Sequence, residues 1–147
     1  MSALRRTLAV ALPTAAVLAL GVAPAQADVG IYCVDAQANC GHFYYNTGLK
    51  GSRTVFTGKS GQMGSISNLA GYTFLSSGAG QGQPVKNNAA SFYNASMQVA
   101  TVFYSSQYNG PCDTVAKLTS ANQLVQTYNE NASLGFGLIG QNCHMFN

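Results

Sequence analysis

The chain has 147 residues, a formal net charge of +3 at pH 7, and only 7% charged residues. This length suits one compact domain and excludes a protein of several large domains. The few basic residues are scattered along the chain and form no stripe. We therefore expect no nucleic-acid partner and no stable association with a membrane.

Residues 1–27 have the order of a secretory signal peptide. Two arginines come first, an apolar run continues to Val22, and Ala25-Gln26-Ala27 ends the segment. This order predicts cleavage after Ala27 and a secreted, extracellular protein of one domain, residues 28–147. A transmembrane anchor is less favoured, because three residues interrupt a run already shorter than the roughly 20 apolar residues that span a bilayer: Pro13, Gly21 and Pro24.

Residues 28–147 hold few side chains that could perform catalysis. They contain two histidines, three aspartates and one glutamate, whereas acid-base chemistry needs a base held against a partner. His42 lies in a strand-like run beside Phe43, which favours a structural role, and His144 lies close to the C-terminus. Nucleophile-elbow, zinc-protease and phosphate-loop motifs are absent. We therefore expect no enzymatic activity.

Four cysteines lie in the exported part of the chain and predict two disulfides. Three pairings are possible. The short spacing from Cys33 to Cys40 favours a local bridge, which leaves Cys112 to pair with Cys143. Zinc binding is the alternative, but no CxxC pair occurs and neither histidine lies at ligand spacing.

The sequence predicts an all-β protein. Charged helix formers are scarce, and short apolar or aromatic runs are bounded by Gly, Asn and Ser, which is typical of strands; the runs are 42–45, 54–56, 91–93 and 99–104. A Gly- and Ser-rich stretch between Phe56 and Val85 predicts a long loop. Residues 117–128 are a candidate for a short helix, because their apolar side chains lie roughly one and two helical turns apart.

An internal repeat divides this domain into residues 41–96 and 97–147. Phe43-Tyr44-Tyr45 is followed by Leu49-Lys50-Gly51, and Val102-Phe103-Tyr104 is followed at the same spacing by Tyr108-Asn109-Gly110. A second element of each copy is Asn87-Asn88-Ala89-Ala90-Ser91 and Asn129-Glu130-Asn131-Ala132-Ser133. Self-similarity of this kind predicts two copies of one supersecondary unit, here a four-stranded Greek key.

Each repeated position has a physical role. Gly51 and Gly110 lie where an aromatic hairpin folds over, which favours a positive φ. Ser91 and Ser133 follow the Asn pairs at a fixed interval, so their hydroxyls are expected to bond the folded hairpin. Large aromatic side chains are expected to form much of the core: Phe43, Tyr45, Phe92, Phe103 and Phe136.

These spacings resemble the βγ-crystallin Greek-key signature. The cysteine pair followed by Thr47-Gly48-Leu49-Lys50-Gly51-Ser52-Arg53-Thr54-Val55 is also similar to the start of the secreted actinobacterial metalloproteinase inhibitors that use this fold. The resemblance implies a disulfide-stabilised Greek-key sandwich, a local bridge between the first two cysteines, and an extracellular inhibitor without enzymatic activity. The characterised inhibitor of that family presents its protease-facing bond in a short loop closed by two nearby cysteines, which this chain lacks.

The same resemblance suggests calcium binding, since six residues occupy positions that coordinate Ca²⁺ in many βγ-crystallins: Asn87, Asn88, Ser91, Asn129, Glu130 and Ser133. Glu130 is the only carboxylate among them, and calcium sites gain affinity from ligand charge. The sixth position of the signature, often Ser in the family, is Phe92 in one copy and Leu134 in the other. This pattern favours residues that hold turns over metal ligands, and no cofactor is required.

Two functions fit these features. The first is a monomeric peptidase inhibitor that binds an extracellular protease through a rigid loop, and the resemblance implies that this protease is a metalloprotease. The turn stiffened by Pro111 and anchored by Cys112 is the expected inhibitory loop: Tyr108, Asn109, Gly110, Pro111, Cys112 and Asp113. The alternative is a secreted βγ-crystallin-like binding or antimicrobial module, calcium-stabilised and without protease inhibition.

Overall fold

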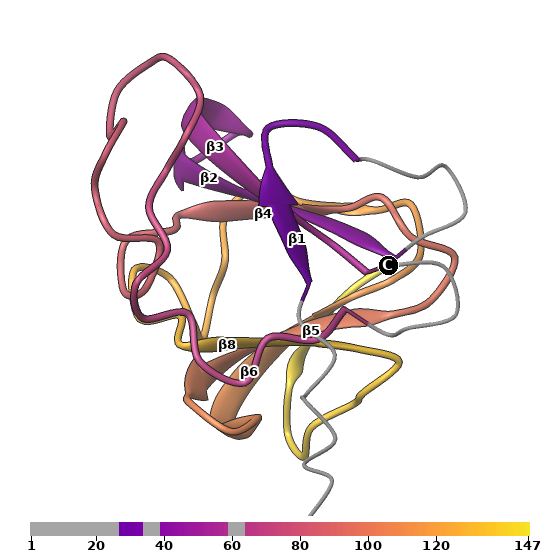
Figure 1. Cartoon of the computed structure of the whole chain (residues 1–147). Helices are drawn as coiled ribbons and strands as arrows, with labels where there is room; N and C mark the ends of the chain where they lie inside the picture. Colours follow the sequence, from indigo (N-terminus) through magenta and orange to yellow (C-terminus); the bar gives the residue numbers. More distant parts are fainter. Residues whose placement is uncertain (1–26, 34–38, 59–63) are drawn as a thin grey trace, which may run out of the picture.

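The computed structural model describes residues 27–33, 39–58 and 64–147 (Figure 1). The predicted signal peptide lies outside these ranges except for Ala27, which is buried. β1 begins directly after Ala27, at the expected cleavage position. Within the described ranges no helix is long and apolar enough to cross a bilayer.

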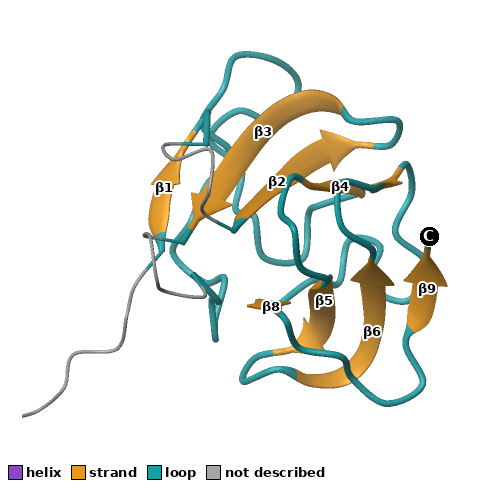
Figure 2. Ribbon diagram, turned by 90° about the vertical axis from the view of Figure 1, so that its right-hand side faces the viewer, coloured by secondary structure: helices purple, strands orange, loops and turns teal. Residues whose placement is uncertain are grey.

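The described chain is all-β and folds into two sheets (Figures 1 and 2). Its strands are β1 (Asp28–Gly30), β2 (Cys40–Asn46), β3 (Lys50–Thr57), β4 (Ser91–Asn94), β5 (Ala100–Ser105), β6 (Asn109–Val115), β7 (Ser120–Ala121), β8 (Ser133–Phe136) and β9 (His144–Phe146). The first sheet has the order β1-β3-β2-β4-β7 and the second the order β8-β5-β6-β9. Among the strands in the described ranges, only β6 and β9 pair in parallel.

The two repeats exchange segments across the sandwich. β7 belongs to the second repeat but pairs with β4 in the first sheet. In return, Ile66 of the first repeat forms a bridge with Leu134 of β8 in the second sheet. Main-chain pairing therefore joins the two repeats in both directions.

The hairpins β2–β3 and β5–β6 share their irregularities, as the repeat predicts. The register of the first shifts between Tyr44 and Asn46, and that of the second between Phe103 and Ser105. Gly51 and Gly110 have φ values of 77° and 82°, a region that glycine enters without strain. The expected role of these glycines is confirmed.

The two repeated serines hold the hairpins as predicted. The Ser91 hydroxyl donates to the Asn46 carbonyl at 2.6 Å and accepts from the Leu49 N–H at 3.1 Å. The Ser133 hydroxyl makes the equivalent bonds to Ser105 and Tyr108, at 2.7 and 3.1 Å. Both serines are fully buried, so each satisfies two backbone groups that water cannot reach.

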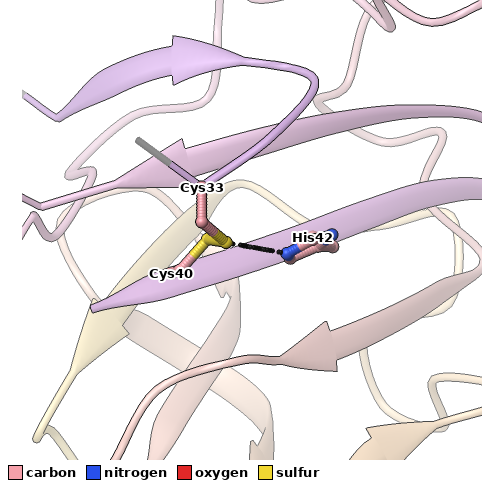
Figure 3. A group of neighbouring side chains, drawn as sticks. All are labelled: Cys33, Cys40 and His42. Atoms are coloured by element: carbon pink, nitrogen blue, oxygen red, sulfur yellow. Dashed lines mark hydrogen bonds between the residues drawn. A yellow bond between two sulfur atoms is a disulfide. The ribbon is translucent and has the colours of Figure 1, made fainter. Parts of the chain in front are cut away.

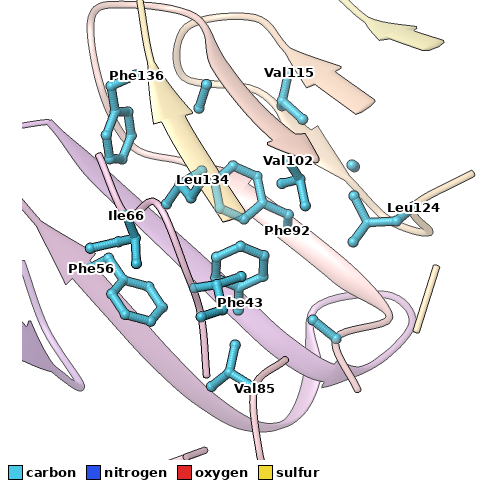
Figure 4. Close-up of a cluster of buried hydrophobic side chains, with 14 of the residues drawn as sticks. Phe43, Phe56, Ile66, Val85, Phe92, Val102, Val115, Leu124, Leu134 and Phe136 are labelled. Carbon is cyan, nitrogen blue, oxygen red and sulfur yellow. The ribbon is translucent and has the colours of Figure 1, made fainter. Parts of the chain in front are cut away.

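The core lies between the sheets (Figure 4). Phe43, Phe92 and Phe136 are fully buried there, as expected, and Tyr45 packs against the cluster while partly exposed. Two further buried aromatic side chains, Phe56 and Phe74, belong to the same cluster. Phe103 is also buried, but it lies outside this cluster, because it points to the opposite face of the second sheet from its neighbour Val102.

The short helix expected over 117–128 is wrong. Leu118 has a positive φ of 53°, and Ser120 and Ala121 form β7. The helical spacing of the apolar residues is coincidental, since Leu124 is buried while Leu118 and Val125 are each 56% exposed. Pairing with β4 overrides the local preference.

Both expected disulfides are present. Cys33 pairs with Cys40 and Cys112 with Cys143. The first bridge joins the segment after β1 to the start of β2. The second joins β6 to the last residue before β9, and it contributes to the site described next.

Candidate functional site

The outer face of the second sheet is buried although it points away from the core. Along β5, Ala100 and Val102 contact the core, so Thr101 and Phe103 point outward. Their β6 partners are Thr114 and Cys112. All four outward side chains are at most 3% exposed, which requires another part of the chain to cover them.

The cover is the connection from β8 to β9, residues 137–143, which we call the strap. β8 and β9 lie at opposite edges of the second sheet, so the strap passes over β5 and β6 (Figure 2). The Thr101 hydroxyl donates to the Leu138 carbonyl at 2.5 Å. A Cβ at Gly140 would lie 2.5 Å from Cys112 Sγ and 2.9 Å from Phe103 Cε1. Only glycine therefore allows the strap to approach this closely.

The strap is held at its far end by a covalent bond and a side-chain amide. The Cys112–Cys143 disulfide joins it to β6. Gln126 donates from Nε2 to the Asn142 carbonyl at 3.0 Å and accepts the Cys112 N–H at Oε1, also at 3.0 Å. The strap is thus fixed to the sheet at both ends, and its geometry is set before any partner binds.

The strap exposes two adjacent apolar side chains. Ile139 is 65% exposed and Leu138 39%, in a segment that carries no charged side chain. Ile139, Gly140 and Gln141 line a shallow depression together with the turn of the β5–β6 hairpin at Tyr108–Gly110. Two loops far apart in sequence therefore form one continuous surface.

The structure divides the expected inhibitory loop. Asn109, Gly110 and Pro111 are exposed, and Tyr108 lies beside the strap. Cys112 and Asp113 are fully buried in β6, so the expectation of one exposed turn through Asp113 is wrong. Burial raises the pKa of the Tyr108 hydroxyl. The outward exposure stops at Cys112 because the strap covers it.

Asp113 supports the site from beneath. Its carboxyl oxygens accept the N–H groups of Val125, Gln126 and Thr127 at 3.1, 3.2 and 2.8 Å and the Thr127 hydroxyl at 2.6 Å. These bonds fix the segment that carries Gln126 and hence one anchor of the strap. Sequence reasoning missed both the strap and this role. The available signal was the adjacent apolar pair Leu138-Ile139 in a polar, glycine-containing stretch shortly before Cys143.

A second cluster lies at the other disulfide (Figure 3). His42 Nε2 is 3.1 Å from Cys33 Sγ and 3.5 Å from Cys40 Sγ. Three potential metal ligands thus meet, but both sulfurs are bonded to each other and are not free thiolates, the form that binds metal. His42 Nδ1 is buried and has no hydrogen-bond partner among the described residues. The ring is packed against Tyr93, which agrees with the structural role expected for it.

This environment makes stability depend on pH. Burial, and then the positive charge of Arg53, lower the pKa of His42 to about 4 from 6.5. Between pH 6.5 and 4 the unfolded chain therefore binds a proton that the folded protein does not. We expect stability to be complete above pH 6.5 and to fall by about 1–2 kcal/mol as the pH drops to 4, after allowance for the ring's partial exposure.

Urea unfolding of His42→Phe measured across that pH range checks this expectation. The variant has no imidazole to protonate, so its stability should not show the decrease between pH 6.5 and 4 that His42 causes. His144→Phe, at an exposed position in β9, is the matched control and should keep it. If the free energy of unfolding of His42→Phe decreases with falling pH as steeply as that of the wild type, other groups cause the pH dependence.

The residues expected at calcium positions are only partly brought together. Asn88 and Asn129, from the two repeats, line one surface depression, and Lys50 lines it as well. Ser91 and Ser133 are engaged with the hairpin backbone. The sixth signature positions, Phe92 and Leu134, are fully buried in the core. A lysine in the same depression and apolar residues at both sixth positions count against a calcium site, because such sites gain affinity from oxygen ligands and their negative charge.

The two sheets with exchanged segments define the class of protein. A solved structure from work on the evolution of the eye lens beta-gamma-crystallin domain fold is similar to this chain, with a TM-score of 0.54 and 9% sequence identity. The similarity covers 78% of this chain and 100% of that one. The fold is therefore βγ-crystallin-like, as the repeat predicted.

The family follows from the sequence. The model of peptidase inhibitor family I36 matches residues 35–115, which is more than half of the chain. The chain belongs to peptidase inhibitor family I36. Membership indicates an inhibitor rather than an enzyme and implies a protease as partner. A search of curated proteins finds no sequence match. The matched residues end at Val115, so the strap lies beyond them.

Proposed function

We propose that this protein is secreted and inhibits an extracellular zinc metalloprotease by tight, non-catalytic binding. The strap is the observation that carries this proposal: an exposed apolar segment fixed at both ends on a rigid sheet. The family supplies the inhibitory function. The similarity of the N-terminal cysteine pair and residues 47–55 to secreted metalloproteinase inhibitors supports the protease class. The two disulfides support an oxidising, extracellular location.

A fixed strap explains how a peptide segment inhibits rather than being consumed. A preorganised loop loses little conformational entropy on binding, so more of the contact energy appears as affinity. If the protease cuts a bond between Leu138 and Asn142, the new C-terminal piece remains bonded to Cys112 through Cys143. The two new ends then stay close together, which slows product release and favours resealing.

The test is a titration of the purified, oxidised protein, beginning at Asp28, against a thermolysin-like metalloprotease and a subtilisin-like serine protease. Residual activity should fall linearly to a sharp one-to-one endpoint with the metalloprotease. The same endpoint with the serine protease alone would keep the inhibitor function and reject the metalloprotease class. If both proteases keep their activity and this protein stays intact, the result would favour the secreted binding or antimicrobial module.

We also infer that the six signature residues serve the fold and not a metal. Lys50 beside Asn88 and Asn129, and the buried Phe92 and Leu134, support this inference. We expect the melting temperature to change by less than about 1 °C between 5 mM CaCl₂ and excess EGTA, since a ligand stabilises a protein only through its affinity for the folded state. A calcium-dependent rise of several degrees would contradict it.

A further inference from the structure

We propose that Ile139 is the side chain that enters the main specificity pocket of the target protease, with the backbone of Ile139–Gly140 lying along the active-site cleft. This inference rests on the proposed inhibitory function and identifies where and how it acts. It places the contact on the strap rather than on the hairpin turn that the sequence suggested.

Exposure combined with anchoring to the sheet favours the strap. Ile139 presents 65% of its surface on a segment fixed by the Thr101 hydroxyl on one side and the Cys112–Cys143 disulfide on the other. Interface hot spots are anchors of this kind, held on a rigid base and surrounded by contacts that exclude water. The neighbouring turn at Tyr108–Gly110 lines the same depression and supplies the second side of the contact surface.

The backbone at Ile139 is available to a protease. Among the residues that the structure describes, none forms a hydrogen bond with the main chain of Ile139 or Gly140. A peptide bound in a protease cleft pairs its main chain with the enzyme, as an added strand does. The unpaired main chain of the strap could therefore form hydrogen bonds with the enzyme while the exposed Ile139 side chain enters a pocket.

The segment around Met97 is the strongest competitor, since Met97 is 70% exposed. The main-chain carbonyls on both sides of Met97, however, already accept hydrogen bonds within the protein. The Gln98 carbonyl accepts Asn94 Nδ2 and the Ser96 hydroxyl, both at 2.8 Å, and the Ser96 carbonyl accepts the Leu118 N–H at 3.2 Å. Met97 is therefore exposed without an available backbone on either side, which makes it a matched control.

The chemistry of the strap restricts the target. Ile139 is aliphatic and β-branched, and residues 137–141 carry no charge. A pocket with a buried carboxylate, which selects Lys or Arg, would gain nothing from it. The target is thus a peptidase with an apolar main pocket, and trypsin-like enzymes are excluded.

Two charge substitutions test the inference. Ile139→Asp should weaken inhibition of the metalloprotease by at least about 100-fold, because a carboxylate would be buried without a partner in an apolar pocket. Met97→Asp should stay within about threefold of wild type. Ile139→Val, which removes one methylene, should weaken inhibition by only about 10-fold. Melting temperatures close to wild type for all three variants would confirm that the fold is intact.

Equal inhibition by Ile139→Asp and wild type would overturn the inference while leaving the proposed function in place. A greater loss in Met97→Asp than in Ile139→Asp would also overturn it and would move the contact to the other loop. If the wild-type protein inhibits neither protease class, the proposed function fails and this inference fails with it.

Discussion

A protein in which Cys112 and Cys143 are both replaced by alanine should change from an inhibitor into a substrate. The bridge closes a sequence separation of 31 residues, so its loss should lower the free energy of unfolding by roughly 3–4 kcal/mol. More importantly, the strap loses its anchor to β6. Its ends are then free to separate after cleavage, and we expect inhibition to weaken by about 100-fold or more as preorganisation is lost.

Incubation of this variant with the metalloprotease, followed over hours by electrophoresis and residual activity, measures both effects. Cys33→Ala/Cys40→Ala is the matched control. That bridge spans a separation of 7 residues, so its loss should cost roughly 2 kcal/mol and leave inhibition intact. Equal loss of inhibition in the two double variants would mean that stability, and not the strap, determines binding.

Replacement of Asp113 by alanine should produce a large loss of stability. The substitution leaves three backbone N–H groups and the Thr127 hydroxyl without their acceptor, and Thr127 is fully buried. Each buried, unpaired group costs about 1–3 kcal/mol, and some regain water. We therefore expect a loss of about 3–5 kcal/mol in total, and a melting temperature lower by roughly 10–20 °C.

Differential scanning calorimetry of Asp113→Ala beside Glu130→Ala tests this expectation. Glu130 is an exposed carboxylate, so its removal should change the melting temperature by no more than about 2 °C. Inhibition should also weaken in Asp113→Ala, because the segment that positions Gln126 is released. A melting temperature near wild type in Asp113→Ala would show that the 125–127 segment does not depend on this carboxyl group.

Much of the fold could be predicted because the same residues recur at the same positions in both repeats. Gly51 and Gly110 adopt the positive φ that their position demands. Ser91 and Ser133 make the expected bonds, and the spacing of the cysteines identified both disulfides. These features depend on local backbone geometry or on cysteine spacing in the exported chain, and such requirements are visible in sequence.

The strap could not be predicted because it depends on long-range topology. Cys112 is buried because the connection from β8 to β9 crosses the outer face of the second sheet. This crossing follows from the position of β9 beside β6, which the sequence does not indicate. The burial of Asp113 also depends on tertiary structure, since its partners at 125–127 lie in a loop 12 to 14 residues further along the chain. The failed helix at 117–128 likewise reflects pairing of Ser120 and Ala121 with β4, which no local pattern reports.

The measurement that tests the central claim most directly is the position of the first bond cut in the complex. The inhibitor would be incubated with the metalloprotease, recovered in acid, and analysed by mass spectrometry before and after reduction. We expect a species heavier by one water that stays in one piece until the Cys112–Cys143 bridge is reduced and then releases a C-terminal fragment beginning between Ile139 and Gln141. A first cut in the Gln107–Pro111 turn, or anywhere else outside the strap, would contradict the account.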